Sequence, residues 1–181
     1  MTNFILNLGL LLILAIFQVS FLSVLPLPIN SFNLILSLVV FVTIIISYQK
    51  GLWWALGGGL FLEFYRASFF GLATISLILT VIIINFLFNN LFTNRSLYTL
   101  LILGFFATIC ESVLAVILSL ILTIFGWPIT FLEFHFWQNL VWQPILNLLM
   151  LIIIFFIYQY SVGKIRNVFL PFDYYESKNK N

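Results

Sequence analysis

Long apolar runs are the feature that most limits what this chain can fold into. The chain has 181 residues, 64% of them hydrophobic, and its seven basic and five acidic residues amount to only 7% of the sequence. Soluble domains are about a quarter charged, so this chain has too few charges to cover a surface in water. Disordered chains combine low hydrophobicity with high charge, which is the opposite composition. The sequence therefore predicts an integral membrane protein.

The apolar runs divide the chain into six candidate transmembrane helices. A helix needs about 20 apolar residues to cross the hydrocarbon core of a bilayer. The runs do not alternate between apolar and polar residues, which is the pattern of transmembrane strands. The prediction is an all-α polytopic protein with one six-helix transmembrane domain, residues 1–162, and a short polar cytoplasmic tail, residues 163–181. The expected spans are residues 4–25, 32–48, 52–65, 71–92, 96–125 and 140–160.

Two segments need separate comment. The first span lacks the pattern of a cleaved signal peptide, because no basic residue precedes it and its apolar run is too long. The third span, residues 52–65, is short and Gly-rich: it covers roughly 21 Å of a core about 30 Å thick. Its three glycines (Gly57, Gly58 and Gly59) weaken a helix but allow close packing. We expect a short enclosed helix or a bent, partly re-entrant one.

The basic residues predict the orientation in the membrane, because cytoplasmic loops are enriched in Lys and Arg. With six spans, both termini lie on one side, and only Arg66 falls on the other. Both termini are therefore expected in the cytoplasm. Trp53 and Trp54 then lie at the inner interface, where an apolar ring with an N–H group is favoured. The inner basic residues are Lys50, Arg95, Lys164, Arg166, Lys178 and Lys180.

Three charged residues lie in or directly after a predicted span, and a charge inside the bilayer costs a few kcal/mol. Glu63 and Arg66 are three residues apart, so a helix places them side by side. At about 1.5 Å per residue, Arg66 and Glu111 both lie roughly 24 Å from the inner face. We predict a buried Glu63–Arg66–Glu111 cluster that neutralises charge and fixes helix packing. A partner or substrate contact is an alternative, and Arg66 reaching the outer headgroups is another.

Amide and hydroxyl side chains inside the spans are expected to form hydrogen bonds between helices. Asn85 and Asn89, four residues apart, lie on one face of a helix. Their default role is to hold helices together. The other residues expected to do the same are Gln18, Asn33, Thr108 and Asn147.

No catalytic, cofactor or metal site is predicted. The single cysteine, Cys110, excludes an internal disulfide, and the single histidine, His135, excludes a His-rich metal site. Glu133 and His135 have no third ligand nearby. They belong to an aromatic-rich stretch, residues 129–139, that is expected to anchor at the outer interface or to dock a protein. No nucleophile, base and orienting group occur together, and the net charge of +2 offers no basic stripe for nucleic acid.

The run from Gly51 to Leu72 resembles the rod-shape-determining protein MreD family. That family carries a charged residue and Gly, a Gly-rich short helix, an acidic residue, a small polar stretch and then Gly-Leu. Gln18 and the turn at residues 93–98 fit as well, so the resemblance covers about residues 17–101. Two positions depart from it: the acidic residue is Glu63 instead of the commoner Asp, and Arg66 replaces a small or acidic residue.

The resemblance implies a non-enzymatic component of the cell-wall elongation machinery. Such proteins bind MreC, a bitopic scaffold, near RodA, the elongation transpeptidase and MreB filaments. It also implies a fold like the S component of energy-coupling-factor vitamin transporters, which is the alternative function. Glu63, Arg66, Glu111 and residues 126–139 could then line a vitamin pocket, although the first span lacks an Ala-rich patch. The expected partner-binding residues are Gly57, Gly58, Gly59, Arg66, Ser68, Gly71, Thr93, Asn94 and Arg95.

Overall fold

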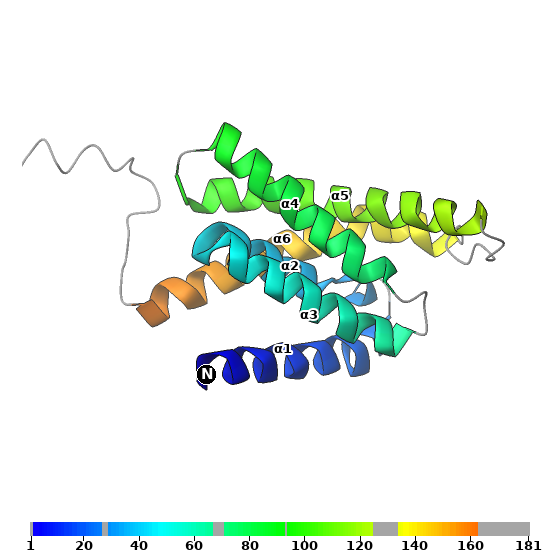
Figure 1. Ribbon diagram of the computed structural model, residues 1–181, viewed down its shortest axis with the longest axis horizontal. Coiled ribbons are helices and arrows are strands. Elements are labelled where there is room, and N and C mark those ends of the chain that lie inside the picture. The colour runs from blue at the N-terminus through cyan, green and yellow to red at the C-terminus, as the bar shows by residue number, and fades with distance from the viewer. Residues whose placement is uncertain (1, 27–28, 67–70, 93, 125–133, 163–181) are drawn as a thin grey trace, which may run out of the picture.

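The computed structural model describes residues 2–26, 29–66, 71–92, 94–124 and 134–162 (Figure 1). Within these ranges the chain is helical, with short connections and no strand. The single turns η1 (Leu22–Val24) and η2 (Ile29–Ser31) lead into the second helix, which a π-helical turn, η3 (Val42–Ile46), extends. The six α-helices are α1 (Thr2–Ser20), α2 (Leu34–Phe41), α3 (Tyr48–Arg66), α4 (Leu72–Leu91), α5 (Leu97–Ile124) and α6 (Phe134–Val162).

Within the described residues, three helices are long and apolar enough to cross a bilayer. They are Leu72–Leu91, Leu97–Ile124 and the Val141–Tyr160 part of α6. Two shorter apolar helices, Gly9–Ser20 and Leu34–Ile46, accompany them. This composition is that of a membrane-embedded helical protein.

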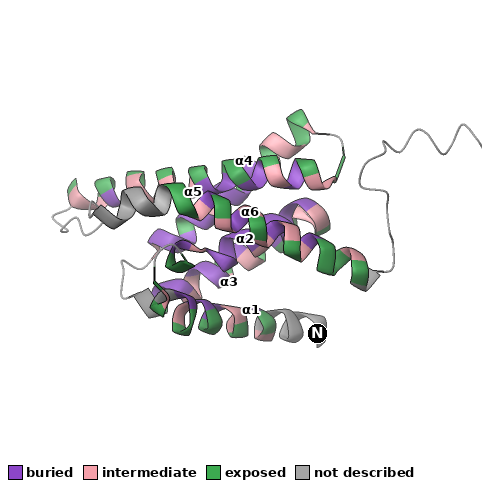
Figure 2. Ribbon diagram, turned by 180° about the vertical axis from the view of Figure 1, so that it is seen from behind, coloured by how far each residue is buried: buried purple, intermediate pink, exposed green. Residues whose placement is uncertain are grey.

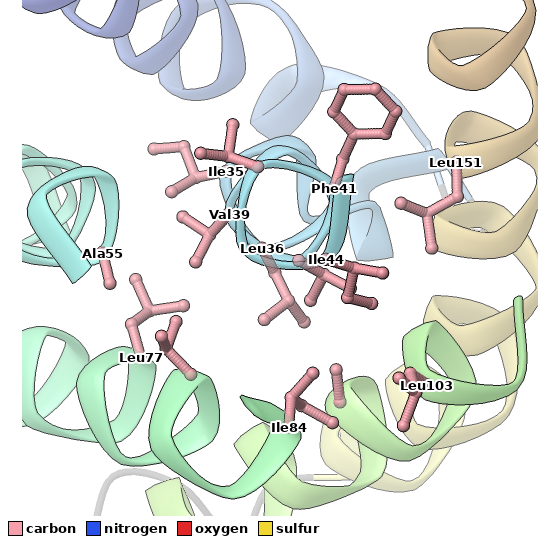
Figure 3. Packing of buried hydrophobic residues seen from close by; sticks show 14 of the residues in the cluster. Ile35, Leu36, Val39, Phe41, Ile44, Ala55, Leu77, Ile84, Leu103 and Leu151 are labelled. Atoms are coloured by element: carbon pink, nitrogen blue, oxygen red, sulfur yellow. The ribbon is translucent and has the colours of Figure 1, made fainter. Parts of the chain in front are cut away.

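Helix α2 lies at the centre of the bundle. It packs against α1, α3, α4, α5 and α6, which surround it. Figure 3 shows Ile35, Leu36 and Val39 pointing from α2 toward the surrounding helices. Every residue of α2 is buried except Leu38, which is half-buried. A helix that is apolar on all sides can only be stable in such an enclosed position or in lipid.

The surrounding helices carry many exposed residues, shown in green in Figure 2. Large exposed hydrophobic residues occur on α1, α5 and α6, for example Ile13, Ile124 and Phe156. A soluble protein rarely exposes so much contiguous apolar surface. Lipid is the medium that suits these faces.

The third helix is longer than predicted. It begins at Tyr48, not near Leu52, and runs without a break to Arg66. Ser47 makes the earlier start possible, because its hydroxyl accepts from the Lys50 N–H at 3.4 Å and its carbonyl accepts from the Gly51 N–H at 3.0 Å. Among the six described α-helices, α2 is the shortest, and residues 52–65 lie within one continuous α-helix.

The last helix also begins earlier than predicted. Residues 134–139, part of the expected interfacial stretch, belong to α6, and Pro144 lies inside the helix. Glu133 lies outside the described residues, as do the predicted tail at residues 163–181 and the side chain of His135.

Candidate functional site

Polar side chains gather at three helix ends in this otherwise apolar fold. They lie at the N-terminus of α2, at the N-terminus of α4 and at the C-terminus of η3. Each helix end leaves backbone N–H or C=O groups without partners inside the helix. Because lipid cannot supply those partners, other parts of the chain must do so.

Three amide side chains cap the N-terminus of α2. Asn33 is the N-cap residue, and its Oδ1 accepts from the Leu36 N–H at 3.1 Å. Gln18 of α1 accepts from the Ile35 N–H at 3.0 Å and donates to Asn33 Oδ1 at 3.4 Å. Asn147 of α6 accepts from the Asn33 N–H at 3.0 Å. One helix end thus joins α1, α2 and α6.

These contacts are enclosed by the bundle. Gln18, Asn33 and Asn147 are all buried, Asn147 almost completely. A buried N–H group without a partner costs about 1–3 kcal/mol, so each amide oxygen has a large local effect. Within the described residues, Asn147 Nδ2 has no hydrogen-bond partner. The amide is therefore fixed by its oxygen alone.

Glu63 caps the N-terminus of α4. Gly71 precedes that helix with φ of 102°, a left-handed conformation that suits glycine, and glycine has no side chain to cap with. The buried carboxylate of Glu63 takes over this role, accepting from the Thr74 N–H at 2.7 Å. A negative charge is favoured at the positive end of a helix dipole.

Two oxygen atoms beside this contact remain without hydrogen bonds. Glu63 Oε2 and Thr74 Oγ1 are both buried and have no partner in the part of the chain that the structure describes. The contact between Glu63 and Thr74 links α3 to α4, and two buried oxygen atoms next to it can still form hydrogen bonds.

Arg95 caps the opposite end of the central helix. Arg95 lies in the connection between α4 and α5, and its Nη1 donates to Ile45 O at 2.8 Å and to Ile46 O at 3.2 Å. These carbonyls end η3, which continues α2. A cation is favoured at the negative end of a helix dipole. Side chains from other elements therefore hold the central helix at both ends.

The three glycines of α3 each face a different helix. A Cβ on Gly57 would meet Leu11 Cδ1 of α1 at 3.4 Å. A Cβ on Gly58 would meet Ile35 Cγ2 of α2 at 2.6 Å, and one on Gly59 would meet Thr74 Cα of α4 at 2.5 Å. The three glycines therefore allow other helices of this chain to pack closely against α3.

The predicted charge cluster remains a prediction. Glu63 is buried as expected, and Glu111 is half-buried on α5. Arg66 ends α3, but its side chain lies outside the described residues. Of the predicted partner-binding residues, Gly58 and Gly59 are buried, Gly57 and Gly71 half-buried, Asn94 and Arg95 exposed, and Ser68 and Thr93 outside the description.

The predicted hydrogen bonds between helices are confirmed for Gln18, Asn33 and Asn147. Thr108 instead donates to carbonyls of its own helix, Gly104 O and Phe105 O. Sequence reasoning did not identify Thr74 as the partner of Glu63. The signal was present: Gly71 has no side chain to cap the helix, so the Thr74 N–H, three residues further on, needs an acceptor from elsewhere in the chain.

Comparison with known proteins does not assign this chain to a family. No family model, curated protein or solved structure matches this chain. Among the described residues, no group of three His, Cys, Asp or Glu side chains could hold a metal ion.

Proposed function

We propose that this chain is a non-catalytic component of the bacterial cell-wall elongation machinery. It crosses the plasma membrane six times, with both termini in the cytoplasm. It binds an MreC-like bitopic protein and helps to regulate cell shape and peptidoglycan synthesis. RodA, the elongation transpeptidase and MreB are its further partners.

One observation supports this proposal most directly. Residues that carry the resemblance to MreD also hold helix ends together: Gln18 at α2, Glu63 at α4 and Arg95 at η3. Such contacts join separate helices into one framework. A framework of this kind suits a protein whose task is to position others.

Partner identification tests the proposal. A C-terminally tagged copy is extracted from its native membrane in mild detergent, and the co-purifying proteins are identified by mass spectrometry. An MreC-like bitopic protein, with RodA or the transpeptidase, is the expected result. Recovery of a membrane coupling subunit with paired ATPases would contradict it.

The second candidate is a transporter S component, and the unpaired buried polar atoms favour it. Glu63 Oε2, Thr74 Oγ1 and Asn147 Nδ2 could bind a polar ligand if the helices around them separated. A large rise in melting temperature with a vitamin would support this candidate and count against the scaffold.

A further inference from the structure

Two exposed cations lie at the same end of the bundle. Lys50 is in the first turn of α3, and Arg95 lies just before α5. The Arg95 guanidinium donates to the carbonyls of Ile45 and Ile46. The next residue along the chain, Ser47, accepts from the Lys50 N–H with its hydroxyl. Residues far apart in the sequence are thus brought to one short connection.

The positive charge at this end has no acidic counterpart in the described part of the chain. The two acidic residues described, Glu63 and Glu111, lie roughly 20 Å from Lys50 and 24 Å from Arg95 along their own helices. Lys50 also occupies the first turn of a helix, where the dipole disfavours a cation. An anionic group beside these two cations would balance this charge.

The guanidinium of Arg95 is fixed but not saturated. Arginine has five N–H donors, and within the described residues only Nη1 of Arg95 makes hydrogen bonds. The contact with η3 holds the group in place while its side chain stays exposed. A planar fork of free donors matches two oxygens of a phosphate group.

An exposed aromatic residue accompanies each cation. Trp53, 65% exposed, follows Lys50 on α3, and Tyr98, 56% exposed, follows Arg95 on α5. Lys50 and Trp53, three residues apart on α3, are neighbours on its surface, and Tyr98 lies three residues after Arg95 in the first turn of α5. Exposed Trp and Tyr in a membrane protein favour headgroup depth, where ring and polar tip are both accommodated.

We propose that Lys50, Trp53, Arg95 and Tyr98 bind the headgroup of an anionic phospholipid. The two cations contact the phosphate, and the two rings lie against the glycerol and upper acyl region. This site requires that the protein lies in a bilayer, but it does not depend on which proteins it binds.

Thermal unfolding of the full chain in mild detergent tests the site. Phosphatidylglycerol is expected to raise the melting temperature more than phosphatidylcholine does. The double variant Lys50→Gln/Arg95→Gln should lose at least half of that difference. The control Lys164→Gln/Arg166→Gln removes the same charge and should keep the difference.

Three outcomes would overturn the site. Equal losses in both double variants would mean that net charge alone attracts the lipid. An unchanged difference in Lys50→Gln/Arg95→Gln would mean that the lipid binds elsewhere. A comparable shift with inorganic phosphate would indicate a free anion instead of a lipid.

The single variant Lys50→Gln keeps the test valid if Arg95→Gln fails to fold. Removing Arg95 also uncaps η3, whereas the Lys50 side chain is exposed and its backbone bond to Ser47 is unaffected. Lys50→Gln alone should lower the lipid-dependent difference without lowering the melting temperature in detergent. An undiminished difference would exclude Lys50 from the site.

Discussion

At the scale of single residues, the three glycines of α3 differ in what surrounds them. Gly59 faces backbone of α4, which cannot move without shifting a helix. Gly57 faces the end of the flexible Leu11 side chain. The same substitution at these two positions therefore separates close packing from helix propensity.

Gly59→Ala should destabilise the protein by about 1–3 kcal/mol, the usual cost of overpacking. Gly57→Ala should be neutral or slightly stabilising, because alanine favours helix by up to about 1 kcal/mol over glycine. Melting temperatures in one detergent would check both variants. Equal effects at the two positions would contradict the packing described for Gly59.

Asn147 provides a second prediction at this scale. Asn147→Leu leaves the Asn33 N–H buried without an acceptor and should cost about 1–3 kcal/mol. Asn89→Leu, at an exposed position of α4, is the control and should change the melting temperature little. A stable Asn147→Leu variant would mean that the amide contact contributes little.

At the scale of elements, the sequence predicts where most helices lie but not how they contact. The predicted spans 71–92 and 96–125 match α4 and α5 closely, because long apolar runs between polar breaks define them. The central place of α2 could not be predicted, since a helix apolar on all sides gives no directional pattern. The contact between Asn33 and Asn147 joins residues 114 apart, which local spacing cannot reveal.

The cap on α4 leads to a prediction for that element. Glu63→Ala removes the acceptor for the Thr74 N–H and should speed amide hydrogen exchange in the first turn of α4. Glu63→Gln keeps an oxygen that can accept the same bond and should restore most of the protection. Hydrogen exchange measured by mass spectrometry would separate the two variants. If both exchange like the unaltered protein, Glu63 does not cap the helix.

At the scale of the whole molecule, the orientation in the membrane can be measured directly. Asn94 is exposed in the connection between α4 and α5, and Ser68 lies in the predicted outer loop. In a Cys110→Ala background, Asn94→Cys should resist an impermeant thiol reagent in intact cells, and Ser68→Cys should react. Labelling of Asn94→Cys in intact cells would reverse the proposed orientation.

The amide contacts at the start of α2 also bear on biosynthesis. The central helix leaves the ribosome early, but the acceptor for its N-cap N–H is Asn147, near the end of the chain. A nascent protein that stops before α6 therefore holds an unsatisfied polar group in its core. Chains truncated before α6 should therefore be degraded faster than the full-length protein.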